Sequence, residues 1–453
     1  MLAHRSFPGL RTAGSAALLA ALALAAAPAV ADTAKARRAD LAHAGRHNAK
    51  PPRAASTAKA AVAAPAKPAV PLTAKAPELR DGQAEARLME VYRLAARGQG
   101  REALQQAESL ARDYPHFQLA QLAVGDLLMA RTRPVRRLGD VPEPDTVRSI
   151  QAATALDELR NESRQRVDAL RSRPPQGTVP AQFLELSART RHAIAVDASR
   201  SRLYLFENTA KGLELVADYY ASVGKLGIEK GTEGDQRTPL GVYFITSRLD
   251  PATLKDFYGA GALPINYPNP LDQRRGKTGS GIWLHGTPPD QFARAPLSTD
   301  GCLVLANPDL ERLLRTVEPR STPVVIARQL QWVAAHSVQA DRTAFDAVLN
   351  AWRSAKTAGD MDRLLSFYAP DFQSARKKPL QEWAEVLQAE ARALRGRELH
   401  LKDKTYLRWT DAADTMVVTF GEVAAGARTG QVKRQYWTRR GQHWQIFFEG
   451  VIG

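Results

Sequence analysis

Three patterns of hydrophobic positions follow one another along the chain. From about residue 79, apolar side chains recur every three or four positions, which is the spacing of amphipathic helices. From about residue 190 they alternate as in β-strands, and from about residue 338 a helical pattern leads into long alternating segments. This succession predicts a multidomain protein with a helical domain, a mainly β domain and an α+β domain.

The helical pattern covers residues 79–185. Its apolar stripes include Leu88, Val91, Tyr92 and Ala95, and then Leu104, Ala107, Leu110 and Ala111. The run 97–104 resembles the turn of a tetratricopeptide repeat, although barely one and a half repeats are present and an array needs about three. A further helix is predicted over about 146–172. We interpret this segment as a TPR-like domain that mediates contacts, with homodimerisation as one such contact.

The mainly β domain is predicted over 190–328. Its expected strands are 193–197, 202–206, 213–223, 240–247, 282–284 and 323–326. A helix is expected after the last glycine-rich loop, with Asn307 as its N-cap and Pro308 at its first position.

The last domain is predicted over 338–453, with helices first and then strands at 399–409, 414–424, 431–439 and 444–448. This order indicates a curved antiparallel sheet with helices on it, an α+β cone. Its many aromatic residues are interpreted mainly as core.

The N-terminus has the pattern of a secretory signal peptide over 1–31. A start with Arg5 and Arg11 precedes an apolar run too short to span a bilayer, and Ala29-Val30-Ala31 supplies a small-x-small cleavage site. We therefore expect export to the periplasm, with no membrane span after cleavage. Residues 32–78, rich in Ala, Lys and Pro, are predicted to be a disordered basic linker.

Charge and cysteine content narrow the classes of function. The formal net charge of +16 favours anionic partners, but no nucleic-acid-binding motif accompanies it, so nucleic acid is not expected. The single cysteine, Cys302, excludes an intrachain disulfide and a multi-cysteine metal site.

The candidate chemistry lies in one segment that contains Cys302. The tract 281–287, Gly-Ile-Trp-Leu-His-Gly-Thr, precedes the tract 298–304, Ser-Thr-Asp-Gly-Cys-Leu-Val. A thiol needs a base to become a nucleophile near neutral pH, and His285 at a strand end can be that base. Gly301 allows close backbone approach and N–H groups that point at an oxyanion.

These tracts resemble the His-Gly … [Ser/Thr]-x-Gly-Cys signature of the YkuD-type L,D-transpeptidases. The segment 237–243, Arg-Thr-Pro-Leu-Gly-Val-Tyr, resembles a second element of that family. Val304 stands where many members have an arginine two residues after the cysteine. The C-terminal cone is similar to the NTF2-like domain of a subgroup that includes cell-shape L,D-carboxypeptidases.

The resemblance implies a role for each site residue. Cys302 would be the nucleophile and His285 the proton acceptor and donor, with Gly301 supplying an oxyanion N–H and Gly286 orienting the imidazole through its carbonyl. Substrate contacts are expected from Thr299, Asp300, Arg237, Trp283 and Tyr267. No cofactor or metal is implied.

The reaction implied is attack on the L-centred residue of a tetrapeptide stem of peptidoglycan, release of D-Ala and transfer of the acyl group to an amine. One alternative is an L,D-carboxypeptidase, in which water accepts the acyl group and a tripeptide remains. A non-enzymatic alternative is a wall-binding scaffold with a degenerate catalytic fold.

Overall fold

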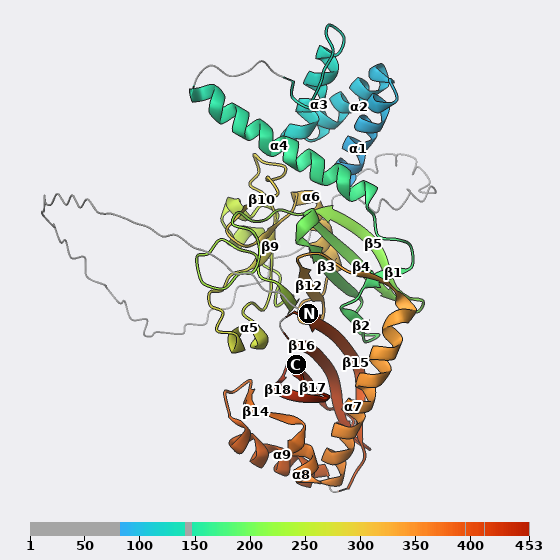
Figure 1. The fold of residues 1–453 in the computed structure, drawn as a ribbon, viewed down its shortest axis with the longest axis vertical. Coiled ribbons are helices and arrows are strands. Elements are labelled where there is room, and N and C mark those ends of the chain that lie inside the picture. The colour runs from blue at the N-terminus through green and yellow to red at the C-terminus, as the bar shows by residue number, and fades with distance from the viewer. Residues whose placement is uncertain (1–81, 141–146, 395, 412, 453) are drawn as a thin grey trace, which may run out of the picture. The chain divides into compact units, whose positions relative to one another are not determined.

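The computed structural model describes residues 82–140, 147–394, 396–411 and 413–452 (Figure 1). The expected signal peptide over 1–31 and the basic linker over 32–78 lie outside the described residues. The α-helices are α1 (Gln83–Ala96), α2 (Gly100–Asp113), α3 (Gln118–Met129), α4 (Val147–Arg171), α5 (Pro270–Arg274), α6 (Asn307–Thr316), α7 (Gln339–Ala358), α8 (Met361–Ser366) and α9 (Leu380–Leu394). In the described part of the chain, no helix is both long and apolar enough to cross a membrane.

The strands fall into a central group and a C-terminal group. The central group comprises β1 (Thr178–Pro180), β3 (His192–Asp197), β4 (Arg202–Thr209), β5 (Gly212–Tyr220), β6 (Val223–Gly224), β7 (Gly241–Phe244), β8 (Ala262–Pro264), β9 (Trp283–His285), β10 (Leu297–Thr299), β11 (Leu303–Val304), β12 (Pro323–Ala327) and β13 (Trp332–Ala334). The C-terminal sheet comprises β2 (Phe183–Glu185), β14 (Tyr368–Ser374), β15 (Leu399–Thr410), β16 (Asp414–Ala424), β17 (Gln431–Arg440) and β18 (His443–Val451).

Helices α1 to α4 form the N-terminal helical domain. Their apolar stripes meet in a cluster that contains Leu88, Leu110 and Leu119, all fully buried. The predicted helices are therefore present, and α4 lies within one residue of its expected bounds. Their similarity to a tetratricopeptide repeat stays a prediction.

The central domain is built on a five-stranded sheet in the order β5-β4-β3-β12-β7. All residues of β3 are buried, because both faces of this sheet are covered. One face packs on a cluster that contains Ile194, Leu284 and Leu303, which brings the smaller sheet β11-β9-β8 against it. This packing supports the two strands that carry the candidate chemistry.

The C-terminal domain is a six-stranded sheet in the order β14-β18-β17-β16-β15-β2, with helices on one face. Side chains along β16 alternate between the two faces of the sheet. Val418 and Phe420 lie in the same buried cluster as Trp352 of α7. Val417 lies in a different cluster, together with Ala195 and Tyr204 of the central sheet. The two sheets thus share one buried apolar cluster, so the helix-free face of the C-terminal sheet is also covered.

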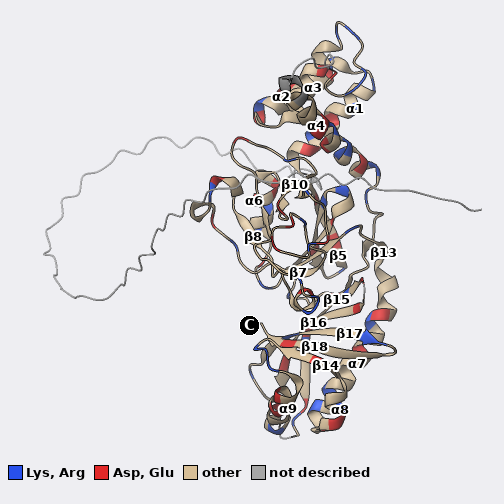
Figure 2. Ribbon diagram, turned by 60° about the vertical axis from the view of Figure 1, so that its left-hand side comes forward, with Lys and Arg blue, Asp and Glu red and all other residues tan. Residues whose placement is uncertain are grey.

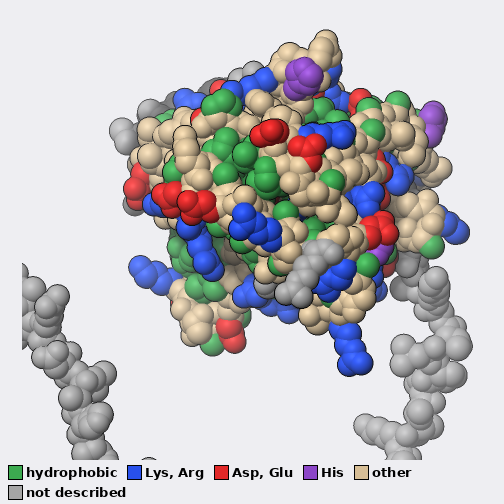
Figure 3. All heavy atoms as spheres, turned by 90° about the horizontal axis from the view of Figure 1, so that it is seen from below, with side chains coloured by type: hydrophobic (Ala, Val, Ile, Leu, Met, Phe, Trp, Pro, Cys, Tyr) green, Lys and Arg blue, Asp and Glu red, His purple; other side chains and the backbone are tan. Residues whose placement is uncertain are grey.

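Charged side chains are distributed over the whole described chain. Figure 2 shows acidic and basic residues interspersed along helices such as α4 and α7. The face drawn in Figure 3 likewise carries both signs, with many Lys and Arg side chains at its lower margin. The face in Figure 3 is therefore not of one sign alone.

Candidate active site

Two short parallel strands bring the candidate nucleophile and the candidate base to one cavity. Strands β9 and β11 pair in parallel, with Leu303 opposite Leu284 and Val304 opposite His285. Cys302 directly precedes β11, and its Sγ lies 3.5 Å from the carbonyl oxygen of Gly281. His285 and Cys302 line the same cavity, which has a volume of about 360 Å³.

The turn before Cys302 requires a glycine. Gly301 has φ of +120°, and a Cβ there would lie 2.7 Å from the carbonyl oxygen of Arg237. The Gly301 carbonyl accepts a hydrogen bond from the hydroxyl of Thr238 at 3.0 Å. Thr238 belongs to the Thr-Pro element, so this upstream segment fixes the orientation of the nucleophile's turn.

The N–H of Gly301 does not fit the oxyanion role expected of it. This N–H donates to the Thr299 hydroxyl at 3.1 Å, and the same hydroxyl donates to the Cys302 carbonyl at 2.7 Å. The reason is the tight turn, which folds the Thr299 side chain back over the two following peptides. The expected donor is therefore engaged within its own loop.

His285 is buried, and its imidazole is oriented by the chain that follows it. Its Nδ1 lies 2.8 Å from the carbonyl oxygen of Gly286, which is the contact expected from the sequence. Burial lowers the pKa of His285 to about 4, against a smaller raising effect of the Gly286 hydrogen bond. The imidazole is therefore neutral near pH 7, and a proton on Nδ1 would leave Nε2 as the acceptor.

The thiol of Cys302 is also in its neutral form at rest. Burial raises its pKa above the ordinary value, while a hydrogen bond from the Trp283 backbone and the positive charges of Lys230 and Arg294 oppose this rise. The pair is therefore a thiol and an imidazole, and not a preformed thiolate and imidazolium.

Asn307 holds together the loops that flank His285. Its Oδ1 accepts from the backbone N–H of Ala260 at 2.9 Å and of Thr287 at 3.2 Å, and its Nδ2 donates to the Thr287 carbonyl at 2.9 Å. A Cβ on Gly286 would lie 2.0 Å from this Oδ1. The prediction that Asn307 is the N-cap of α6 is wrong, since Ala306 is the N-cap. The side chain bonds loops distant in sequence and not its own helix.

Arg294 supplies a positive charge to the cavity that sequence reasoning did not identify. Its Cζ lies 4.4 Å from the ring centroid of Phe257, and both side chains line the cavity with His285 and Cys302. Its buried Nε has no hydrogen-bond partner among the described residues, and burial lowers the pKa of the guanidinium. Arg294 lies between the two motif halves, where no sequence pattern distinguishes it from other loop arginines.

Lys230 is a second cation at the cavity, and it is neutralised. Its Nζ lies 2.8 Å from Oδ1 of Asp235. Burial alone would raise the pKa of Asp235, but hydrogen bonds from Lys230 and from three backbone N–H groups lower it to about 2. The Lys230–Asp235 pair therefore braces the loop, whereas Arg294 keeps its charge available.

The five residues expected to contact substrate are distributed unevenly. Thr299 and Asp300 line the cavity, and the Asp300 carboxylate lies 3.4 Å from Lys225. Arg237, Trp283 and Tyr267 are not among the lining residues.

The bonds of these three side chains point to other roles. The Arg237 guanidinium donates to the Ile228 carbonyl, and the Trp283 ring stacks on Tyr258 at 4.9 Å between centroids. Tyr267 is buried, and its hydroxyl donates to the Thr278 carbonyl at 3.0 Å. A substrate role for any of the five stays a prediction.

Residues 191–326 match the family described as the YkuD L,D-transpeptidase catalytic domain. The chain carries a YkuD catalytic domain. Residues 344–450 match the Cds6 C-terminal NTF2-like domain, so the C-terminal cone is an NTF2-like domain.

Solved structures with this arrangement are similar to most of the described chain. Bd1075 of Bdellovibrio bacteriovorus is 26% identical, with a TM-score of 0.52, and the match covers 61% of this chain and 98% of Bd1075. The helical cell shape determining protein Pgp2 of Campylobacter jejuni is 22% identical, with a TM-score of 0.48, over 60% of this chain and 95% of Pgp2. No curated protein matches the chain.

Proposed function

We propose that the YkuD domain is a cysteine acyl-transferase that acts on the peptide stems of peptidoglycan, as an L,D-transpeptidase. One observation carries this proposal: Cys302 and His285 line one cavity at the ends of paired parallel strands. A thiol, a neutral imidazole and a backbone N–H are sufficient for acyl transfer through a thioester.

The first half-reaction forms the thioester. His285 takes the proton from Cys302 as the sulfur attacks the carbonyl carbon of the third, L-centred residue of a tetrapeptide. The N–H of Cys302 is the oxyanion donor that we propose, because the Gly301 N–H is engaged by Thr299. The C–N bond then breaks, and D-Ala leaves with the proton that His285 held.

Arg294 is the residue that we propose to bind the terminal carboxylate of the departing D-Ala. Val304 leaves no cation two residues after the nucleophile, whereas Arg294 places a guanidinium in the cavity with its Nε unpartnered. A planar guanidinium matches a carboxylate with two parallel hydrogen bonds. Thr299 and Asp300 would border the same subsite.

The second half-reaction depends on the acceptor. An amine of a second stem attacks the thioester carbonyl, the C–S bond breaks, and a cross-link forms as the thiol is regenerated. Water is the alternative acceptor and would yield a tripeptide, as in an L,D-carboxypeptidase. The match to the Cds6 C-terminal domain supports this alternative, because the resemblance includes cell-shape carboxypeptidases.

Digestion of purified tetrapeptide muropeptides by the mature chain tests the proposal. Dimers with released D-Ala indicate transpeptidation, and tripeptide with D-Ala alone indicates carboxypeptidation. Cys302→Ala and His285→Ala should abolish both products, whereas His336→Ala, at an exposed histidine, should not. Retained turnover in Cys302→Ala would overturn the mechanism.

A wall-binding scaffold would give a different result. Exposure to a carbapenem followed by intact-mass measurement should show a covalent adduct that is lost in Cys302→Ala. A folded protein that forms no adduct and releases no D-Ala would support the scaffold. Export to the periplasm and dimerisation through α1–α4 are part of the same proposal, and mass photometry of the mature chain tests the dimer.

A further inference from the structure

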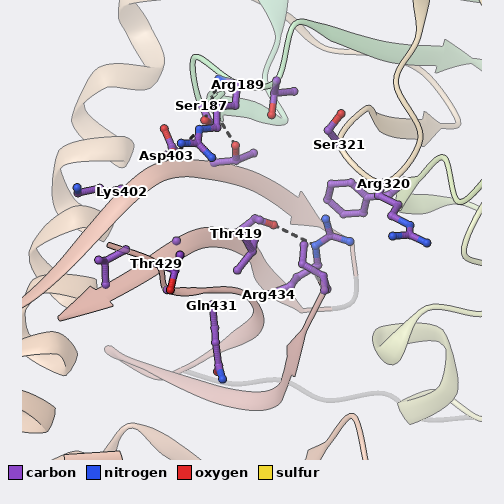
Figure 4. Close-up of a pocket in the computed structure, with 18 of the residues that line it drawn as sticks. Ser187, Arg189, Arg320, Ser321, Lys402, Asp403, Thr419, Thr429, Gln431 and Arg434 are labelled. Carbon is purple, nitrogen blue, oxygen red and sulfur yellow. Dashed lines mark hydrogen bonds and ion pairs between the residues drawn. The ribbon is translucent and has the colours of Figure 1, made fainter. Parts of the chain in front are cut away.

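A second cavity lies between the C-terminal sheet, the segment 187–190 that precedes β3, and residues of the YkuD domain on β7 and in the loop before β12. Its volume is about 500 Å³. Arg434, Thr419 and Gln431 line it from the sheet, and Ser187, Phe244 and Arg320 line it from the preceding domain (Figure 4). Because Val418 and Phe420 pack toward the helices, their neighbour Thr419 lies on the opposite face. The cavity is therefore outside the interior of the NTF2-like cone and apart from Cys302.

Arg434 is a buried cation without a counter-charge. It is 8% exposed, and its Cζ lies 3.2 Å from the ring centroid of Phe244. Its Nε donates to the Thr419 hydroxyl at 3.0 Å, and within the described ranges no carboxylate forms an ion pair with it. Burial lowers the pKa of Arg434 to about 10, a cost that a structural residue would ordinarily avoid through a partner.

The neighbouring residue on the same strand shows the contrast. Lys433 points to the other face of the sheet, where its Nζ lies 2.8 Å from Glu390, 2.9 Å from Glu422 and 3.3 Å from Glu449. Three carboxylates therefore neutralise Lys433, and none neutralises Arg434. An anion from outside the chain would neutralise Arg434 as these carboxylates neutralise Lys433.

The remaining lining of the cavity is also positive. Five cationic residues line it, namely Arg189, Arg320, Lys402, Arg428 and Arg434. Asp403 is the one carboxylate among the described lining residues, and it lies 2.9 Å from Nε of Arg189. Hydroxyl and amide groups of Ser187, Ser321, Thr429 and Gln431 fill out the polar wall (Figure 4). A lining with an excess of one charge concentrates ligands of the opposite charge.

We propose that this cavity binds an oxyanion, a carboxylate or a phosphate, on a hydroxyl-bearing carrier about the size of one sugar, with Arg434 as its anchor. The guanidinium lies over the Phe244 ring and its Nε donates to the Thr419 hydroxyl, so the direction of its two remaining nitrogens is fixed. Arg320 comes from the YkuD domain, so an anion held between Arg320 and Arg434 would bridge two domains.

Isothermal titration of the mature chain at low salt tests this site. The probes are glucose 6-phosphate, glucuronate and inorganic phosphate, with glucose as the neutral control. We expect saturable binding of at least one charged sugar and none of glucose. Preference for glucose 6-phosphate would identify phosphate as the ligand group, and preference for glucuronate would identify carboxylate. Absence of saturable binding of every charged probe would overturn the proposal.

Substitutions of lining residues test whether the measured binding occurs in this cavity. Arg434→Met should weaken it at least tenfold, whereas Arg294→Gln, which alters only the cavity at Cys302, should leave it unchanged. If Arg434→Met fails to fold, the double variant Arg320→Gln/Arg428→Gln decides, with the same tenfold loss expected. If the variants at Arg434 or at Arg320 and Arg428 bind the probe as tightly as the unsubstituted protein does, binding does not occur in this cavity. Loss of binding in Arg294→Gln would place it in the cavity at Cys302 instead. Because muropeptide cleavage is measured separately, failure of this site leaves the proposed reaction untouched.

Discussion

At the scale of single residues, burial sets the protonation of the two reacting groups. It lowers the pKa of His285 to about 4 and raises the pKa of Cys302, and both shifts lower the fraction of the pair that is thiolate and imidazolium. Near pH 7 the imidazole and the thiol are therefore both neutral. In the proposed mechanism the proton would therefore transfer during attack on the substrate, and Cys302 would not be a thiolate beforehand.

The pH dependence follows from these directions. Because His285 loses its proton well below its ordinary pKa of 6.5, muropeptide cleavage should continue undiminished from pH 7 to about pH 5.5. Because the thiolate of Cys302 forms only above the ordinary pKa, alkylation by iodoacetamide should still be rising at pH 9. The rate of Cys302 alkylation at each pH is measured by quenching the reaction at set times and quantifying the adduct by mass spectrometry. A plateau below pH 7 would show a preformed ion pair instead.

Gly301→Ala tests the turn at the nucleophile. The residue has φ of +120°, and a Cβ would meet the Arg237 carbonyl, so the turn must move and shift Cys302. We expect a loss of kcat of at least a hundredfold, with the domain still folded by circular dichroism. Gly276→Ala is the matched control, since Gly276 also has a positive φ but nothing within 4 Å of its Cβ position. A similar loss of kcat in both variants would refute the positional argument.

At the scale of elements, a side chain on α6 fixes the loops around His285. Asn307 reaches two segments that lie 47 and 20 positions away in sequence, around Ala260 and Thr287. Both polar atoms of the Asn307 amide take part, because Oδ1 accepts hydrogen bonds and Nδ2 donates one. The helix thus positions the imidazole without contacting it.

Asn307→Ala should therefore reduce both stability and activity. Loss of buried hydrogen bonds predicts destabilisation of about 1–3 kcal/mol in urea unfolding, with a lower kcat. Asn307→Asp keeps the acceptor and should recover part of the loss. Asn350→Ala, at an exposed asparagine on α7, should change stability by less than about 0.5 kcal/mol. Full activity in Asn307→Ala would remove Asn307 from the positioning residues.

At the scale of the whole molecule, buried charges join the helical domain to the YkuD domain. Arg202 of β4 lies 2.8 Å from Glu85 of α1, and Arg166 of α4 lies 3.3 Å from the same carboxylate. Burial and then the charge of Glu85 raise the pKa of Asp309 to about 7, against the opposing effects of Arg166 and Arg202. Asp309, which these charges perturb, therefore titrates near neutral pH.

The sign of the resulting pH dependence is fixed by this raised pKa. The folded state binds the Asp309 proton more tightly than the unfolded state, so its contribution to stability is full below about pH 4 and is lost as pH rises toward 7. Asp309→Asn removes this loss and should stabilise the protein at pH 8 by up to about 4 kcal/mol, with little change at pH 4. Urea unfolding at both pH values measures the difference. An asparagine variant that is less stable at pH 8 would contradict the assignment.

Local patterns were sufficient to predict most elements and to place His285 and Cys302 at one candidate site. Alternation over a few residues predicted β3, β4 and the long C-terminal strands, because strand faces are set by a period of two along the chain. A short continuous apolar run predicted β12 as a buried strand. The motif spacing predicted that Cys302 and His285 belong to one site, and the YkuD and NTF2-like matches agree with the fold expected from it. These features are encoded in short windows of sequence.

Packing between distant segments decided the rest. No local pattern indicated that β2 would join the C-terminal sheet, that Arg294 would enter the cavity at Cys302, or that Asn307 would bond two loops and not cap its helix. Nor could a local pattern distinguish Lys433, which has three carboxylates, from Arg434, which has none. A side chain's partners depend on which sheet faces meet, and that is settled by burial of apolar surface across the whole chain.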